Sequence, residues 1–200
     1  MGARNPSTTA KRPYHVLISE IRLKRRALEL ARILERDFAG RDLVVVSLLT
    51  GTVMFIADLI RNLSLPLRLD FIGVSSYRDG AVSRELVFTK ELRIDVRGRH
   101  VLLVDDILDT GRTLRAVLAK LRQLKPRTIK TCVLLDKPAG RTAPMKADYV
   151  GFEIPDLFVV GYGLDFAERF RNLPYVAVLK PEVYRTANAA KLKSRRRRGS

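Results

Sequence analysis

The chain is poor in the residues that build disulfide frameworks and structural metal sites. Its 200 residues include one cysteine, two histidines and no tryptophan. A lone thiol cannot form an internal disulfide, and these few side chains are too few for a structural zinc site. Cys132 lies in the apolar segment TCVLL, so we expect it to be a small buried hydrophobic residue in a reducing compartment.

Long apolar segments are missing as well. No run approaches the roughly 20 residues that a membrane-spanning helix needs. The N-terminal segment MGARNPSTTAKRP has no apolar signal core, and Pro6 stands where a myristoylation signal requires Ser or Thr. We therefore expect a soluble, cytoplasmic protein with no membrane partner.

Acidic residues are scarce relative to basic ones, which number 38 against 21 and give a net charge of +17. The ends, 1–13 and 185–200, contribute +3 and +7 without a single acid, and the body over 14–184 contributes the other +7. We predict a basic flexible N-terminus and a basic disordered tail, the tail capable of weak nonspecific binding to polyanions. The moderately basic body suits an anionic small molecule at least as well as nucleic acid.

Within the body, helical and strand-like patterns alternate, and the hydrophobic content of 46% suffices for a packed core. Helices are predicted over about 16–38, 53–63 and 114–125, and strands over 43–49, 67–76, 101–106, 128–136, 149–154, 158–161 and 175–180, with 87–94 as a hairpin arm. This order predicts an α/β fold with a twisted, mainly parallel sheet flanked by helices. In such folds ligands bind beyond the carboxyl ends of the strands.

The most informative motif is VLLVDDILDTGRTL, residues 101–114. Asp105 and Asp106 close a predicted buried strand, and Asp109 opens a turn that runs into a helix. Gly111 permits a tight turn, and the amides of 110–113 can form an anion-binding nest at the positive helix end. The motif therefore predicts a phosphate cradle beside carboxylates that can hold ribose hydroxyls or a hard cation. The alternative is an acidic strand end followed by an ordinary helix cap.

Two acids followed by Asp-Thr-Gly-x-Thr resemble the phosphoribosyl diphosphate site of type I phosphoribosyltransferases. The segment ADYVGFEIPDLFVVGYGLDFAERFRNLPYVAVLKPEVY, residues 147–184, is similar to the C-terminal hood region of the hypoxanthine-guanine phosphoribosyltransferases. SLLTGTVMFIADL, DFIGVSSY and LLDKP resemble that family in order and spacing. The resemblance spans about 14–184 and implies one phosphoribosyltransferase domain with a small hood made from about 14–40 and 148–184.

The resemblance also implies an activity. The expected reaction moves the 5-phosphoribosyl group from phosphoribosyl diphosphate to N9 of hypoxanthine or guanine, giving IMP or GMP and diphosphate in purine salvage. Mg²⁺ is the expected cofactor, and a homodimer or homotetramer the expected assembly. A regulatory protein of the same fold that binds nucleotide and nucleic acid is the alternative. The enzyme is favoured because every catalytic-type position holds a competent side chain.

Individual roles follow from the same resemblance. Asp109 becomes the candidate general base near purine N7, Lys137 the donor to the 6-oxo group, Phe158 the plate that stacks on the base, and Val159 a backbone partner of the ring edge. Asp105, Asp106 and Asp165 are the implied magnesium ligands. The implied donor-binding residues are Leu49, Thr50, Gly51, Ser76, Tyr77, Asp105, Asp106, Thr110, Gly111, Arg112, Thr113 and Arg171. Taken singly, Lys137 also fits a solvated turn, Phe158 the core and Arg171 the surface.

Two departures from the family pattern concern the donor. Thr50 stands where many relatives have a lysine in the diphosphate loop, and Ser76-Tyr77 is followed by RDGAVSREL instead of the usual glycine- and serine-rich lid. Arg112 replaces another common lysine and keeps its charge. We expect activity to survive, because backbone amides of the 50–52 loop still grip the diphosphate.

Overall fold

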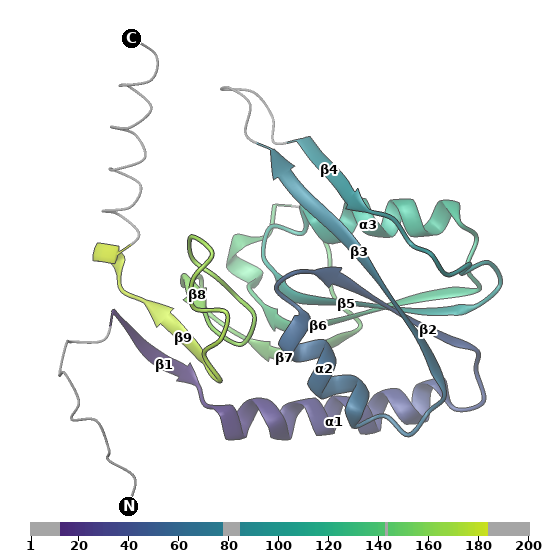
Figure 1. Cartoon of the computed structure of the whole chain (residues 1–200), viewed down its shortest axis with the longest axis horizontal. Coiled ribbons are helices and arrows are strands. Elements are labelled where there is room, and N and C mark those ends of the chain that lie inside the picture. Colours follow the sequence, from purple (N-terminus) through teal and green to yellow (C-terminus); the bar gives the residue numbers. More distant parts are fainter. Residues whose placement is uncertain (1–12, 78–84, 143, 184–200) are drawn as a thin grey trace, which may run out of the picture.

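The computed structural model describes residues 13–77, 85–142 and 144–183 and contains a six-stranded sheet (Figure 1). Its strand order is β4-β3-β2-β5-β6-β7, and all neighbours run parallel except the antiparallel pair β3 and β4. The strands are β2 (Leu43–Leu49), β3 (Leu67–Tyr77), β4 (Glu85–Lys90), β5 (His100–Leu108), β6 (Thr128–Asp136) and β7 (Tyr149–Glu153). The predicted mainly parallel α/β sheet is confirmed.

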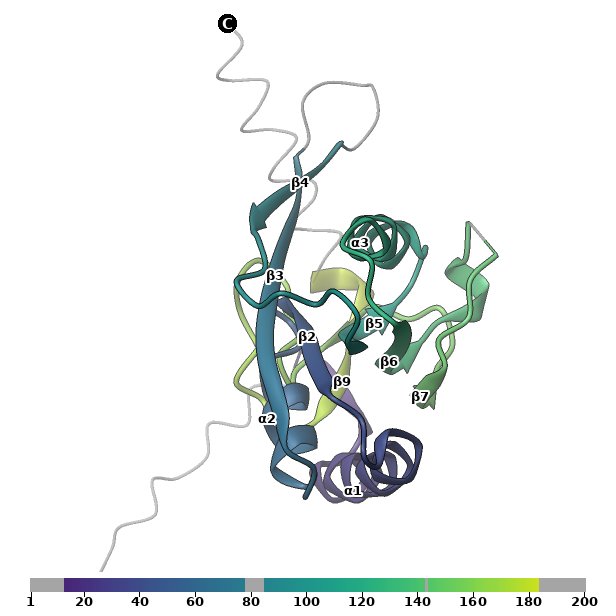
Figure 2. The ribbon, with the colours of Figure 1, turned by 90° about the vertical axis from the view of Figure 1, so that its right-hand side faces the viewer.

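Helices cover both faces of this sheet (Figure 2). On one face, α1 (Glu20–Phe38) and α2 (Val53–Arg61) pack against Val45, Leu102 and Cys132. On the other face, α3 (Arg112–Gln123) packs against Val46 and Leu103. Alternate residues of the central strands thus serve opposite faces, which explains their nearly continuous apolar sequence.

Cys132 behaves as expected from its apolar surroundings. Its thiol is fully buried on β6, and burial raises its pKa to about 12. A thiol held in the protonated form is a poor nucleophile and metal ligand. Cys132 is therefore a packing residue of the core.

A second, three-stranded antiparallel sheet has the order β1-β9-β8 and lies beside the main sheet (Figure 1). It joins β1 (Tyr14–Ile18), β8 (Val159–Val160) and β9 (Val176–Leu179). The predicted hood segments, about 14–40 and 148–184, contain these three strands, and their bounds stay a prediction. The same segments contain α1, which packs in the core of the main sheet, and β7, which forms its edge.

Several element bounds differ from the sequence prediction. Residues 16–18, expected to begin the first helix, belong to β1 because this segment pairs with β9, which lies near the other end of the sequence. β5 continues to Leu108, which places Asp105 and Asp106 inside the strand, and α3 begins two residues before the predicted 114. Thr52 is the N-terminal cap residue of α2, yet its hydroxyl donates to the Leu48 carbonyl and not to a helix amide.

Some predictions fall outside the described residues. These are the basic N-terminus apart from Pro13, the basic tail and the polar segment 78–84 that follows Tyr77. None of the helices in the described part of the chain is both long and apolar enough to cross a membrane.

Candidate functional site

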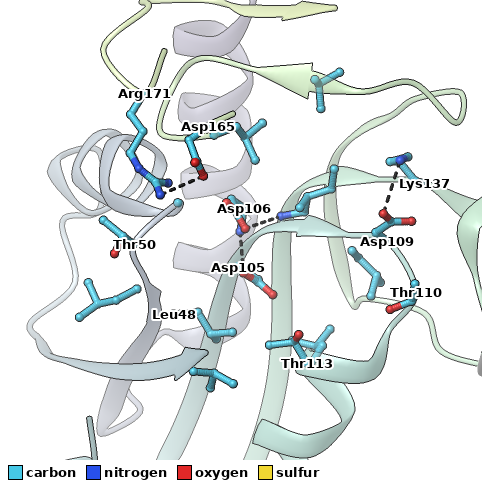
Figure 3. A pocket seen from close by; sticks show the side chains of 18 of the residues that line it. Leu48, Thr50, Asp105, Asp106, Asp109, Thr110, Thr113, Lys137, Asp165 and Arg171 are labelled. Atoms are coloured by element: carbon cyan, nitrogen blue, oxygen red, sulfur yellow. Dashed lines mark hydrogen bonds and ion pairs between the residues drawn. The ribbon is translucent and has the colours of Figure 1, made fainter. Parts of the chain in front are cut away.

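A cavity of about 730 Å³ opens at the carboxyl ends of the parallel strands, between the main sheet and the loop that follows β8. Most of the side chains predicted for the site meet here, although they come from four separate stretches of sequence (Figure 3). The predicted residues that line the cavity are Leu49, Thr50, Gly51, Asp105, Asp106, Asp109, Thr110, Gly111, Thr113, Lys137, Phe158, Val159, Asp165 and Arg171.

Three predicted donor-binding residues are not placed in the wall. Arg112 begins α3 and is exposed, outside the lining residues. Ser76 and Tyr77 end β3, where they pair with Leu86 and Glu85 of β4, and their side chains lie outside the described part of the structure. Their predicted contact with the donor stays a prediction.

Two adjacent carboxylates form the floor of the cavity. Asp105 is buried and Asp106 half-buried. Burial raises the pKa of Asp105 well above its usual range, and the neighbouring charge of Asp106 adds to the effect. Burial also raises the pKa of Asp106, although hydrogen bonds and the charge of Arg171 oppose it. A cation or a proton therefore stabilises this pair.

The loop of residues 49–51 packs closely between this floor and the loop after β8. The Leu49–Thr50 peptide bond is cis. A Cβ atom on Gly51 would lie 1.7 Å from Oδ2 of Asp106, and one on Gly163 would lie 1.9 Å from the Gly51 carbonyl oxygen. Because neither position has room for a side chain, glycine is what brings Asp106, the 49–51 loop and the 161–163 turn into contact.

Residues 109–113 form a turn that leads into α3, and its binding of an anion stays a prediction. Gly111 has a φ of +82° and is the N-terminal cap residue of α3, so the amides that follow it stand at the positive end of the helix. Thr110 accepts a hydrogen bond from the Arg112 amide through its Oγ1, at 3.4 Å. The turn and the carboxylate pair line one cavity, an arrangement that suits a phosphorylated ligand carrying hydroxyl groups.

Lys137 is a buried residue of this cavity and not a solvated turn lysine. Its side chain is 9% exposed, and Nζ lies 2.7 Å from Oδ1 of Asp156. Nζ also lies 3.5 Å from Oδ2 of Asp109 (Figure 3). Asp109 itself is held close to the chain, since a Cβ on Gly140 would lie 2.1 Å from its Oδ1. Asp109 and Lys137 therefore form one unit that can accept and donate hydrogen bonds to the same ligand.

The hood side supplies the opposite wall. Arg171 pairs with Asp165 at 2.9 Å (Figure 3) and donates from Nη1 to the Gly163 carbonyl at 2.9 Å, so it is not an isolated surface charge. Phe158 is 42% exposed and presents its ring to the cavity wall, edge-on to Phe166 at a centroid distance of 5.5 Å. Neither residue follows the alternative that its local sequence allowed.

Sequence reasoning missed several residues of the site. Ser75 lines the cavity, and its Oγ is the one buried side-chain polar atom without a hydrogen-bond partner in the described part of the chain. Its position beside the recognised Ser76-Tyr77 pair was an available signal. No motif marked Asp156 or Arg141, and Gly163 was visible in GYG without any indication of its contact with Gly51.

The residues present fit a divalent metal that shares its ligands with the substrate. No group of three or more potential metal ligands occurs among the described residues. Magnesium, however, is usually held by one or two carboxylates together with substrate phosphates. The Asp105–Asp106 pair, with Asp165 on the opposite wall, offers oxygen donors of that kind.

Comparisons with known proteins agree with this geometry. Residues 20–167 match the family described as the phosphoribosyl transferase domain. The chain is 47% identical over 170 residues to a hypoxanthine-guanine phosphoribosyltransferase of Bacillus subtilis, covering 84% of this chain and 94% of that protein. The chain is also 48% identical over 170 residues to the bifunctional protein TilS/HprT of Listeria innocua. That match covers 84% of this chain but only 26% of the relative's length.

A solved structure is equally close. The crystal structure of a hypoxanthine phosphoribosyltransferase from Staphylococcus aureus superimposes with a TM-score of 0.81 at 44% identity. The match covers 85% of this chain and 93% of that one.

Proposed function

Since the chain belongs to the phosphoribosyltransferase family, we propose that it moves the 5-phosphoribosyl group from phosphoribosyl diphosphate to N9 of hypoxanthine or guanine. The products are IMP or GMP and diphosphate, which is a purine-salvage reaction. The observation that carries this proposal is one cavity that combines a carboxylate pair, a helix N-terminal anion turn and the Asp109–Lys137 unit. Its working unit is the domain over 14–184.

Donor binding uses two anion-binding loops. The turn over 110–113 holds the 5′-phosphate through amides and the hydroxyls of Thr110 and Thr113, while Asp105 and Asp106 hold the ribose hydroxyls. The backbone amides of the 50–52 loop and the guanidinium of Arg171 hold the diphosphate. As the bond from the anomeric carbon breaks, negative charge grows on the diphosphate, and these amides and the guanidinium stabilise it. Ser76 and Tyr77 cover the reacting centre and keep water out.

Magnesium is the proposed cofactor, held by Asp105, Asp106 and Asp165. When bound, it neutralises charge on the diphosphate and orients the donor. The raised pKa values of the first two carboxyls support this assignment, because a cation relieves the repulsion between them.

The purine lies against Phe158 with its 6-oxo group facing Lys137. The buried ammonium donates to that oxygen and disfavours an exocyclic amino group at the same place. Val159 supplies backbone contacts to the ring edge. Asp109 accepts the proton that the purine releases when N9 attacks.

The remaining proposals concern the surroundings of the enzyme. We propose a homodimer or homotetramer in the cytoplasm. The basic tail over 185–200 adds weak, nonspecific attraction to polyanions, which its sequence charge supports.

A turnover assay with phosphoribosyl diphosphate, Mg²⁺ and each of hypoxanthine, guanine, xanthine and adenine tests the function. Hypoxanthine or guanine should react and adenine should not, and xanthine shows how far the site accepts other 6-oxopurines. In a Lys137→Ala variant, donor binding should stay near the wild-type value while kcat/KM for the purine falls about tenfold or more, because a buried carbonyl loses a charged partner. Absence of turnover combined with tight nucleotide binding would favour the regulatory alternative.

A further inference from the structure

Arg141 lies outside the lining of the cavity but contacts the turn that forms part of its wall. Its side chain is 12% exposed and pairs with the carboxylate of Asp136 at the end of β6. Nε donates to the Asp109 carbonyl at 2.9 Å, and Nη2 reaches the Leu108 carbonyl at 3.3 Å. Nη1 donates to the carbonyl of Met145. One guanidinium thus joins three backbone carbonyls and one carboxylate.

The residues on either side of Arg141 contact the same turn. Thr142 donates to the Thr110 carbonyl from its amide at 3.3 Å and from Oγ1 at 3.2 Å. Gly140 leaves just enough room for the Asp109 carboxylate. The segment 140–142 therefore contacts the carbonyl side of three successive residues, Leu108, Asp109 and Thr110.

Peptide geometry gives these contacts a consequence for ligand binding. In a trans peptide group the N–H points opposite to the C=O. Carbonyls of Leu108, Asp109 and Thr110 that are held toward 140–142 turn the following amides, those of 109–111, to the opposite side. Asp109, Thr110 and Gly111 all line the cavity. The outer contacts therefore orient the inner amides.

We propose that Arg141 is a positioning residue that orients the backbone amides of Thr110 and Gly111, within the 110–113 turn, for the 5′-phosphate of the donor. This inference rests on the proposed function for the identity of the donor, but not for the existence of a phosphate site. Asp136 completes the device, since its carboxylate fixes the guanidinium in a plane that serves both Leu108 and Asp109.

The test compares Arg141→Ala with Arg141→Lys and with a control, Lys130→Ala, which also removes a cation from an ion pair on β6. Loss of charge-assisted hydrogen bonds should raise the donor KM of Arg141→Ala about tenfold to a hundredfold. The purine KM should change less than about twofold, since no purine-side residue other than Asp109 is touched. Lysine keeps the charge but not the planar guanidinium, so the donor KM of Arg141→Lys should lie between those of the wild type and Arg141→Ala. The control should match the wild type.

A second readout does not depend on activity. In an ¹⁵N-labelled full chain, titration with inorganic phosphate should shift the amide resonance of Gly111, and Arg141→Ala should weaken the apparent affinity about tenfold or more. If Arg141→Ala does not fold, Asp136→Asn gives the same measurement with a milder change. Equal rises in both KM values, or unchanged phosphate affinity in the variants, would overturn the role of Arg141. A wild-type chain that binds phosphate at Gly111 but forms no nucleotide would overturn only the proposed function.

Discussion

The two ends of the parallel strands use charge in opposite ways. At the amino ends, Asp42 is half exposed and satisfied by Arg68 and by Arg99, the latter at 3.3 Å. Nearby, burial lowers the pKa of His100, and the positive charges of Arg41 and Arg127 lower it further. At the carboxyl ends, Asp105 and Asp106 are enclosed beside each other, and burial raises the pKa of both.

The glycines differ in the same way. Gly40 and Gly98, at the amino ends, have positive φ values but no atom within 4 Å of a hypothetical Cβ. Gly51 and Gly163, at the carboxyl ends, have no space for one. At the amino ends of the strands the charged groups already pair with one another. At the carboxyl ends, carboxylates and backbone amides remain for a ligand to pair with. We therefore expect an anionic donor to be held by the local amides and Arg171 of the cavity more than by the overall positive charge of the body.

The largest effect is expected from a substitution at the carboxyl ends of the strands, where Gly51 has no space for a side chain. In Gly51→Ala, the new methyl group meets the Asp106 carboxylate, so the diphosphate loop and the carboxylate pair must separate. We expect kcat/KM for the donor to fall more than about 10³-fold, because a displacement of about 1 Å at the reacting groups already costs about 10²-fold. Steady-state kinetics with varied donor measures it.

Gly40→Ala is the matched control at the open edge. It introduces the same methyl group at a φ of +67° with nothing within 4 Å. It should lower the free energy of unfolding by about 1 kcal/mol through backbone strain and leave kcat unchanged. Similar kinetic losses in both variants would contradict the difference between the two edges.

The next effect concerns Asp109, the proposed proton acceptor. Asp109→Asn preserves the shape of the side chain, so the turn should stay intact while kcat falls about 10²-fold. Asp156→Asn is the control, because Asp156 is the other partner of Lys137. If the two variants lost activity equally, the effect would come from Lys137 and not from proton transfer. Unchanged turnover in Asp109→Asn with both hypoxanthine and guanine would remove it from the mechanism.

Some features of the fold could be predicted from the sequence and others could not. The succession of helices and strands along the chain and the acids of the 105–109 motif were predictable, because apolar runs and the Asp-Thr-Gly turn are local signals. The start of α1 was not, since residues 16–18 have an apolar pattern compatible with a helix and become a strand only by pairing with β9. Nonlocal pairing decides such segments.

The same limit applies to the site. Arg141 carries no motif, and its role depends on the turn after β6 lying beside the turn after β5. That arrangement follows from the register that sets Leu108 opposite Asp136. Gly163 was visible in GYG, but its contact with Gly51 required the hood to be placed over the sheet. Local patterns predict what a residue can do, and packing decides what it touches.

A smaller effect is expected on the stability of the fold, from two buried carboxyls whose pKa values shift in opposite directions. Burial acts to raise the pKa of Asp70, but hydrogen bonds from the amides of Ile94, Arg93 and Phe71 and from Lys90 outweigh it and lower the pKa to about 2. Asp70 should thus stabilise the fold above its ordinary pKa of 3.8, and this stability is lost as the pH falls toward about 2. Asp105, whose pKa is raised, should cost stability as the pH rises above 3.8.

Thermal unfolding in the presence of a chelator measures both. At pH 7, Asp70→Asn should destabilise the fold by about 2 kcal/mol. Asp105→Asn should stabilise it and flatten the decline toward neutral pH. In a separate series without chelator, Mg²⁺ added with the donor should stabilise the wild type more than Asp105→Asn. A parallel pH dependence of the two variants would contradict the contrast between the two carboxyls.

The smallest effect on catalysis is expected from the basic tail. No predicted site residue lies beyond Arg171, and the body already places arginines at the amino ends of the strands, away from the cavity. Deleting 186–200 should therefore leave kcat and the donor KM within about twofold of the wild type. The deletion should weaken retention on heparin. It should also make the slope of log K for DNA binding against log salt concentration less steep, by up to about 0.9 per lost phosphate contact. Replacing Arg195–Arg198 by serine keeps the chain length and should reproduce most of that loss. Residual retention should persist, because the arginines of the amino ends remain. A large fall in kcat with normal unfolding would show instead that the tail takes part in the active site or in a subunit contact.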